Sequence, residues 1–205
     1  IAQSEAATGK KFVNYWIHFA FLEIEGKKMS KSLGNFYSLG DLAERGYNSL
    51  MPLRYFFLTA HYRRKMNFTW EALVGAKTAY GGLIEKMADL LEKGGKIKKS
   101  RGTEEYQQEF SRLLGNDLNT PQGLALLWQV FKDKKLKREE KIFLVVDFDH
   151  IFGLKMKNEA EELLKSRNKN YSKIKELVEE REKLRAEKRW GEADKIRQEI
   201  EKRGY

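Results

Sequence analysis

Cysteine is absent from the 205-residue sequence, which excludes disulfides and thiolate metal sites within this chain. Long apolar runs are absent as well, since none approaches the ~20 residues that a membrane-spanning helix needs. The first residues show no pattern typical of a secretory signal peptide. These absences favour a cytoplasmic protein that binds no membrane.

Proline is scarce, with two residues in the whole chain. Inside a helix, proline removes a hydrogen bond, but in the first turn its missing N–H has no helical partner. Pro52 stands near the start of one predicted helix. Pro121 stands at the first position of another, directly after Thr120, which we expect to cap that helix. Both prolines are therefore compatible with the helices that the apolar spacing predicts.

The chain has an excess of positive charge. Forty Lys+Arg stand against thirty Asp+Glu, which gives a formal net charge of +10. Such a charge favours polyanionic partners, with nucleic acid first among them. A basic surface that serves solubility alone is the alternative that charge by itself leaves open.

The sequence predicts a mainly α fold with an α/β front. Residues 1–9 predict a short helix that ends at a glycine. The aromatic and β-branched run over residues 14–24 predicts a buried or half-buried strand. Ser38 and Asp41 have the spacing of a capping box at the start of a short helix that Gly46 ends.

The later segments predict further helices. Residues 49–64 predict a buried helix with an apolar stripe formed by Leu53, Phe56, Phe57 and Ala60. Another helix begins at Thr69, and the charged, glycine-rich residues 92–103 predict a linker. The stretch 142–153 is β-branched, but its apolar positions also fit a helix ending at a glycine, which we favour. Residues 159–204 predict thin, charged amphipathic helices.

The stretch GKKMSKSLGNF, residues 26–36, places lysines and serines in front of a glycine. Positive charge at Lys28 and Lys31 suits the negative charge that develops when pyrophosphate leaves a nucleotide. Small serines and Gly34 suit a loop that closes over phosphates and reopens. On charge pattern alone, a solvated surface loop is the more common explanation.

Several segments together resemble one enzyme family. KMSKS, residues 28–32, resembles the signature loop of class I aminoacyl-tRNA synthetases. The cysteinyl-tRNA synthetases of that class have similar stretches in the same order: IAQSEAATG, YWIHFAFLEIEGKKMSKSLGNF, LRYFFLTAHYRRKMNFT, NDLNTPQGLALL and RAEKRWGEADKIRQEI. The resemblance covers essentially the whole chain and is loosest near residues 92–103 and 132–170.

This resemblance implies roles for the lysine loop. It assigns catalytic roles to Lys28 and Lys31, of which the second stabilises the transition state of adenylation. The ATP-binding residues that it implies are Lys28, Met29, Ser30, Lys31 and Ser32. The implied cofactor is ATP with magnesium.

The resemblance also implies a division into four regions. These are the end of a Rossmann-type catalytic domain with the KMSKS loop (1–36), a stem-contact region (37–68), a helical bundle (69–153) and a truncated anticodon-binding helical tail (154–205). The implied fold class is therefore the end of an α/β domain followed by an all-α bundle.

Four residues carry the implied RNA contacts. Arg63 and Arg64 stand in the stem-contact region, where we expect contacts to tRNA phosphates. In the tail, the family carries an Arg and an Asp at matching positions around a Trp, which assigns anticodon contacts to Arg185 and Asp194. An Arg fork suits guanine, and an Asp acceptor suits an exocyclic amine. We expect Trp190 between them to be a packing anchor.

The family's His-x-Gly-His signature and its zinc-binding residues do not occur in this sequence. The resemblance therefore implies a C-terminal portion that holds no metal site and is inactive alone, with the zinc ligands outside this chain. The implied activity of the whole, a monomer, is ATP-dependent ligation of cysteine to tRNA(Cys). Two alternatives stay open: a free-standing tRNA-binding module, and a cysteine ligase of thiol biosynthesis, which has no use for an anticodon-binding tail.

Overall fold

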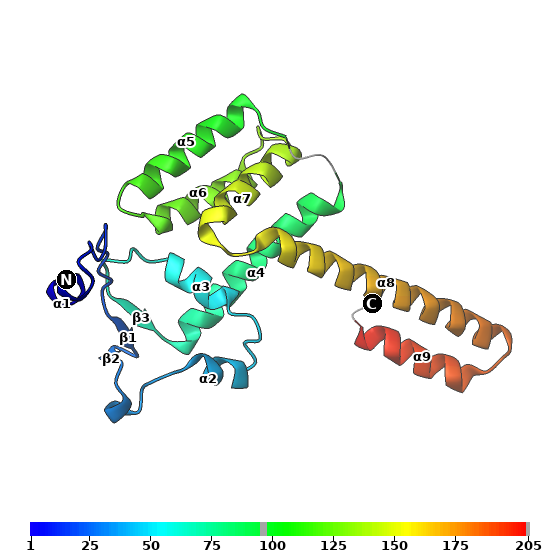
Figure 1. Cartoon of the computed structure of the whole chain (residues 1–205). Coiled ribbons are helices and arrows are strands. Elements are labelled where there is room, and N and C mark those ends of the chain that lie inside the picture. Colours follow the sequence, from blue (N-terminus) through cyan, green and yellow to red (C-terminus); the bar gives the residue numbers. More distant parts are fainter. Residues whose placement is uncertain (95–97, 204–205) are drawn as a thin grey trace. The chain divides into compact units, whose positions relative to one another are not determined.

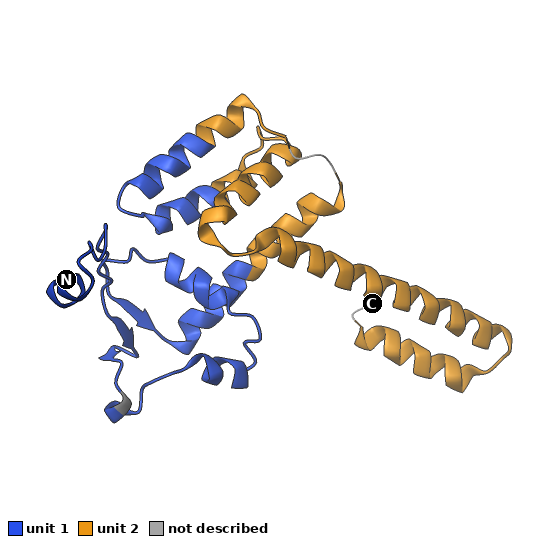
Figure 2. Ribbon diagram, viewed as in Figure 1, with its two compact units in different colours: residues 1–80, 107–127 blue, residues 81–106, 128–205 orange. Residues whose placement is uncertain are grey.

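The computed structural model describes residues 1–94 and 98–203, apart from the side chain of Lys31 (Figure 1). The chain forms two compact units (Figure 2). Unit 1 comprises residues 1–80 and 107–127, and unit 2 comprises residues 81–106 and 128–205.

Most of the described chain is helical, with one small sheet. Unit 1 contains α1 (Ala2–Thr8), β1 (Leu22–Ile24), β2 (Lys27–Lys28), the 3-10 helix η1 (Lys31–Leu33), α2 (Leu39–Glu44), α3 (Met51–Leu58) and β3 (Met66–Phe68). Helices α4 (Trp70–Glu92), α5 (Arg101–Gly115) and α6 (Thr120–Lys132) each contribute residues to both units. Unit 2 adds α7 (Arg138–Phe152), α8 (Met156–Ala186) and α9 (Trp190–Lys202).

The sheet has the strand order β2–β1–β3. Strands β1 and β2 form an antiparallel hairpin whose two turn residues, Glu25 and Gly26, both have positive φ, as tight hairpin turns require. Strand β3 pairs in parallel with β1, so that Ile24 lies beside Phe68. Both of these side chains are almost fully buried, and they anchor the sheet to the helices of unit 1.

The predicted strand over residues 14–24 is wrong for its first part. Within the described chain, only the final three residues form β1. Tyr15, Phe19 and Phe21 are 86%, 74% and 68% exposed, respectively. Aromatic composition favours a strand, but a strand also needs partners for its backbone groups. Strand β1 has such partners in β2 and β3, whereas before it only two backbone hydrogen bonds link the described residues 14–21 to another segment, from Ala20 to Tyr62 and from Met66 to Phe21.

Helix α2 begins where the sequence predicts, whereas α3 covers only Met51–Leu58 of the helix predicted over residues 49–64. Ser38 and Asp41 form the expected capping box at the start of α2, and Pro52 lies in the first turn of α3. The predicted apolar stripe of α3 is only partly right. Its buried side chains are Pro52, Tyr55 and Phe56, whereas Phe57 is 45% exposed. Phe57 instead lines a cavity, because it lies one position beyond the buried face.

Helices α4 and α6 also start close to their predicted caps. The hydroxyl of Thr69 accepts a hydrogen bond from the backbone N–H of Ala72 at 3.1 Å, as a cap does. For α6, the expected cap Thr120 is already helical. The side chain of Asn119 takes that role and accepts from the N–H of Gln122 at 3.3 Å.

The core of unit 2 is built mainly from α7 and its neighbours. The ambiguous stretch 142–153 is helical, as predicted, and α7 ends at Gly153 in the left-handed conformation. The buried side chains of this helix are Ile142, Leu144, Val145, Phe148 and Phe152. Burial on several sides explains why the sequence there lacks polar spacing and resembles a strand. No helix in the described part of the chain is long and apolar enough to cross a membrane.

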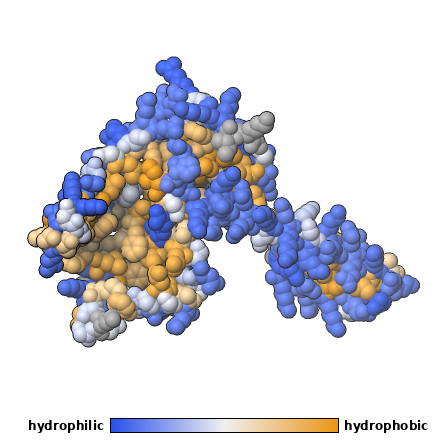
Figure 3. All heavy atoms as spheres, in the orientation of Figure 1, coloured by the Kyte–Doolittle hydropathy of each residue, from blue (hydrophilic) through white to orange (hydrophobic). Residues whose placement is uncertain are grey.

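Helices α8 and α9 form a hairpin with little apolar burial. From residue 170 onward, its buried residues are Ile174, Leu177, Leu184 and Ala193. Figure 3 shows this hairpin as mostly hydrophilic, with its apolar residues confined to a small area. The prediction of thin, charged helices in this region is confirmed.

The start of α8 depends on a carboxylate of α7. Asp149 Oδ1 accepts from the N–H of Leu154 at 2.6 Å, and Oδ2 accepts from the N–H of Met156 at 2.8 Å. Helix-initiating N–H groups have no helical acceptor, so a side chain that binds them stabilises the helix start.

Replacing Asp149 by alanine leaves those two N–H groups without their acceptor. We expect Asp149→Ala to lower the free energy of unfolding by about 1–2 kcal/mol, the usual cost of a lost cap. Urea denaturation followed by circular dichroism measures the change. Glu162→Ala, at an exposed position of α8, is the control. Equal losses in the two variants would refute the capping role.

Candidate nucleotide loop and RNA-binding surfaces

The lysine loop is closed at its base by one asparagine. Asn35 Oδ1 accepts from the backbone N–H of Ser30 at 2.9 Å, and its Nδ2 donates to the carbonyl of Lys28 at 3.1 Å. Gly34 precedes it with φ of 67°, which turns the chain back. The two hydroxyls of Ser30 and Ser32 lie 2.7 Å apart. The loop is thus a small hydrogen-bonded structure at the end of a hairpin.

The side chains of this loop face two environments. Met29 is half-buried and lines an apolar cavity of about 160 Å³ with residues of β1, α2 and α3. Lys28 is exposed, and its Nζ lies 5.5 Å from the centre of the Phe21 ring. Lys31 begins η1, and its side chain lies outside the described part of the chain. Met29 therefore anchors the loop, while an ammonium group and two hydroxyls are available for phosphate oxygens.

A second asparagine fixes the hairpin that carries this loop. Asn67, in the middle of β3, accepts at Oδ1 from the N–H of Gly26 at 2.8 Å. Sequence reasoning missed both Asn35 and Asn67. Asparagine beside a glycine is a turn signal, which makes Asn35 recognisable in hindsight. The role of Asn67 depends on a contact across 41 residues, for which no local pattern exists.

The predicted RNA-binding arginines Arg63 and Arg64 lie in a turn that leads into β3. The turn is held by Asp117, in the connection between α5 and α6. His61 Nε2 donates to the backbone carbonyl of Asp117 at 2.7 Å, and the Tyr62 hydroxyl donates to its carboxylate. Arg63 Nε lies 2.7 Å from Asp117 Oδ2. Three successive side chains thus converge on one residue.

The electrostatics of this cluster follow from those contacts. The hydrogen bond from the Tyr62 hydroxyl, followed by the interactions of Arg63, lowers the pKa of Asp117. The hydrogen bond with Tyr62, followed by that with Asp117, raises the pKa of Arg63. Arg64 differs, because within the described residues its exposed side chain forms no ion pair.

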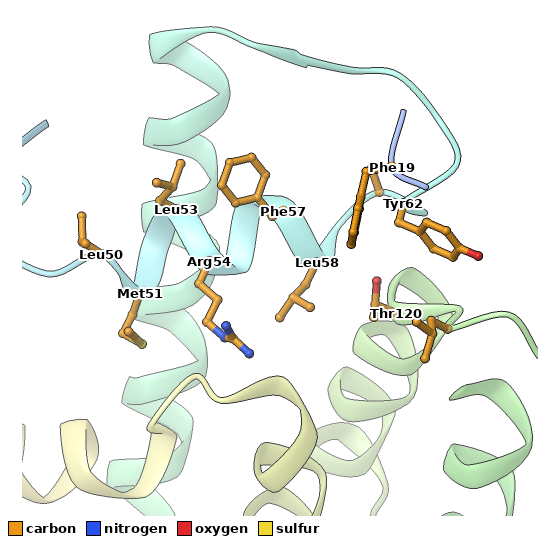
Figure 4. A pocket seen from close by; sticks show the side chains of 11 residues that line it. Phe19, Leu50, Met51, Leu53, Arg54, Phe57, Leu58, Tyr62 and Thr120 are labelled. Carbon is orange, nitrogen blue, oxygen red and sulfur yellow. The ribbon is translucent and has the colours of Figure 1, made fainter. Parts of the chain in front are cut away.

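An apolar cavity of about 480 Å³ lies in unit 1, beside the same turn (Figure 4). In the figure, Leu53, Arg54, Phe57 and Leu58 project from α3, and Phe19 and Tyr62 lie at one end. Phe19 and Phe57 are two of the exposed aromatic side chains that the sequence predicted to be buried. The cavity explains why those positions are apolar although they lie outside the packed core.

The predicted anticodon residues lie at the α8–α9 turn. Arg185 is in the last turn of α8, and Asp194 is in α9; both are exposed. The Arg185 guanidinium lies 6.0 Å from the centre of the Trp190 ring. Trp190 is 56% exposed, so its predicted role as a packing anchor is wrong: it begins a helix at the tip of the hairpin, where little apolar surface covers it.

Neighbouring charges distinguish Arg185 from Arg189. Arg189 binds Glu187 and Glu192 at 3.0 and 2.6 Å, and these carboxylates raise its pKa. In the described chain, neither Arg185 nor Asp194 forms an ion pair. The tip therefore presents a free guanidinium, an exposed indole and a free carboxylate, three groups that suit base recognition.

The chain is similar to known proteins, over its first part and along its whole length. The family described as tRNA synthetases class I (C) catalytic domain matches residues 1–78. Curated proteins named cysteine–tRNA ligase match along the entire chain. The protein of Legionella pneumophila (strain Corby) is 35% identical over 207 residues. Those of Trichodesmium erythraeum and Prochlorococcus marinus (strain AS9601) are 32% and 35% identical over 232 and 238 residues.

The family model and these relatives support a portion of a cysteinyl-tRNA synthetase. All 205 residues are covered in each of these three comparisons. They correspond to 44%, 47% and 48% of the three relatives, so the chain spans less than half of their length. The similarity therefore concerns a portion of a cysteinyl-tRNA synthetase, and the family model covers its first part, including the lysine loop.

The described residues were also expected to hold no metal site. Within residues 1–94 and 98–203, no three His, Asp or Glu side chains lie close enough together to hold a metal ion. Asp149, which the sequence places near Asp147 and His150, is used as a helix cap instead.

The two asparagines of the hairpin and loop predict separate effects on backbone protection. Asn35→Ala removes the acceptor of the Ser30 N–H, and we expect that amide to exchange about fivefold faster, as for ~1 kcal/mol lost with one hydrogen bond. Asn67→Ala is the matched control, which should accelerate exchange at Gly26 instead. Amide hydrogen exchange by NMR distinguishes the two. Acceleration of both amides by either variant would show that the loop has no closure of its own.

Proposed function

We propose that the chain is the part of a cysteine–tRNA ligase that carries the KMSKS loop and the tRNA-binding surfaces. The observation that carries this proposal is the conjunction of an exposed, asparagine-closed lysine loop with similarity, along the whole of this chain, to a portion of proteins named cysteine–tRNA ligase. In that reaction the cysteine carboxylate attacks the α-phosphate of ATP, and pyrophosphate leaves. The cysteinyl group then passes from the adenylate to the 3′ end of the tRNA.

Lys28 and Lys31 act on the departing pyrophosphate in this proposal. Their ammonium groups stabilise negative charge that grows as the bond to the α-phosphate breaks, which favours the transition state over the bound substrate. Ser30 and Ser32 add hydroxyl donors, and Met29 holds the loop against its cavity. The exposed position of Lys28 supports this role, because a phosphate can reach its ammonium group from solvent.

Several finer features belong to the proposed whole enzyme. We infer a Rossmann-type catalytic domain that ends near residue 36, followed by the stem-contact region 37–68, the bundle 69–153 and the anticodon-binding tail 154–205. ATP with magnesium is the inferred cofactor, and zinc is held by residues outside this chain. The inferred enzyme is a cytoplasmic monomer with cysteine and tRNA(Cys) as partners.

The hairpin tip supports anticodon recognition. Arg185 lies beside an exposed indole, and its guanidinium is not neutralised by a carboxylate in the described chain. Arg and Asp read guanine and an exocyclic amine through directed hydrogen bonds, and unstacked bases lie on aromatic or guanidinium planes. We therefore assign base contacts to Arg185 and Asp194 and add Trp190 as a stacking surface.

Two other functions remain alternatives. A cysteine ligase of thiol biosynthesis would have the lysine loop, but it has no use for the Arg185–Trp190–Asp194 tip. A free-standing tRNA-binding module would have the tip, but its lysine loop would need no catalytic role. The names of the relatives favour the ligase over both.

The catalytic proposal predicts a specific kinetic defect. In a full-length cysteine–tRNA ligase that contains this segment, Lys31→Ala should lower kcat for ATP–pyrophosphate exchange far more than it raises KM for cysteine. An interaction made only in the transition state has this signature. The 205-residue chain by itself should show no cysteine-dependent exchange. A Lys31→Ala defect confined to KM, or exchange by the chain alone, would refute the respective assignment.

The anticodon proposal predicts a loss that depends on the tRNA. Arg185→Ala should weaken binding of tRNA(Cys) by about 1–3 kcal/mol, as for one bidentate base contact. The loss should shrink when the anticodon is already altered, because the contact is then absent. Arg181→Ala, one turn earlier on α8, is the control. Equal losses of Arg185→Ala on both tRNAs would show that the tip attracts RNA by charge alone.

A further inference from the structure

The two neighbouring arginines of the RNA-binding turn differ in their surroundings. Arg63 Nε lies 2.7 Å from Asp117 Oδ2, and a second nitrogen of its guanidinium lies 3.3 Å from Asp117 Oδ1. Arg64 projects from the same turn without an ion pair among the described residues, and its backbone N–H binds the carbonyl of His61 at 2.8 Å. Sequence alone makes these two residues equivalent, whereas the structure does not.

Asp117 is well fixed for an exposed residue. It and Leu118 both have positive φ, at 55° and 54°, a conformation that ordinary residues rarely adopt. Such backbone persists only when its surroundings determine it. Here the surroundings are His61, Tyr62 and Arg63, which bind the carbonyl and the carboxylate of Asp117.

This geometry changes how the turn interacts with a phosphate. A phosphate that approaches Arg63 is attracted by the guanidinium but repelled by a carboxylate only 2.7 Å from it. The carboxylate offsets part of the attraction, because it lies within one Debye length of any such phosphate. Arg64 has no carboxylate of this kind within the described chain, so its attraction is not offset.

We propose that Asp117 is a positioning residue of the tRNA-binding surface: it uses Arg63 to hold the turn in place and leaves Arg64 as the phosphate-binding cation. The proposal rests on the proposed function, since it concerns the same RNA contacts. It assigns different roles to two residues that the sequence placed together.

The salt dependence of tRNA binding tests this division. The slope of log K against log salt falls by about 0.9 for each phosphate contact that is lost. We expect Arg64→Ala to reduce the slope for tRNA(Cys) binding to the 205-residue chain by about that amount, and Arg63→Ala to reduce it by clearly less. Asp117→Asn, which keeps the shape and the hydrogen-bond acceptor, should free Arg63 and increase the slope by about the same amount.

A matched control removes the effect of total charge. Glu109→Gln changes the net charge by the same amount and releases Arg112 from a comparable exposed ion pair at 2.7 Å in the same unit. It should leave the slope unchanged. The double variant Asp117→Asn with Arg63→Ala should return the slope to that of the original chain, because the freed cation is then gone.

The outcomes distinguish this inference from the function on which it rests. If Arg64→Ala leaves the slope unchanged, both the inference and the phosphate contacts of this turn are overturned. If Arg64→Ala lowers the slope but Asp117→Asn does not raise it, the inference alone is overturned. Equal losses of slope from Arg63→Ala and Arg64→Ala would also overturn the inference. Both substitutions are at exposed positions, so this comparison remains possible even if Asp117→Asn fails to fold.

Discussion

The parallel pairing of β1 with β3 is the constraint on which the sheet of unit 1 depends. It sets Leu22 beside Met66 and Ile24 beside Phe68, with Ile24 and Phe68 buried. Asn67 extends the pairing to the N–H of Gly26, across 41 residues of sequence. The strand before the lysine loop and the strand after the arginine turn are thereby joined in one sheet. The positions of the lysine loop and of the turn with Arg63 and Arg64 thus depend on the same few hydrogen bonds.

Charge acts locally in this protein rather than through the net excess of basic residues. Arg63, Arg112 and Arg189 are all bound to carboxylates at 2.6–3.0 Å, which offsets much of their field. The cations that are free of such partners in the described chain include Arg64 and Arg185. A phosphate or a base encounters these groups first, so counting lysines and arginines overstates the number of useful contacts.

Local features of the fold could be predicted from the sequence, and features that need distant partners could not. The capping box at Ser38, the proline in the first turn of α3 and the helical nature of 142–153 follow from neighbouring residues. The strand over 14–21 was wrong because composition does not reveal whether a pairing strand exists. The lysine loop could be recognised from its own sequence, KMSKS. Its closure by Asn35 and the anchoring of Arg63 by Asp117 could not, because they depend on three-dimensional proximity.

We propose that this chain recognises tRNA(Cys) through two separate surfaces, the turn with Arg63 and Arg64 and the tip of the α8–α9 hairpin. Ribonuclease footprinting of tRNA(Cys) in the presence of the 205-residue chain tests it most directly. We expect protection of the anticodon loop together with a second protected stretch on the inner side of the L-shaped tRNA. Replacing the anticodon should abolish the first protection and preserve the second. Uniform protection along the whole tRNA, unchanged by the anticodon, would contradict the claim.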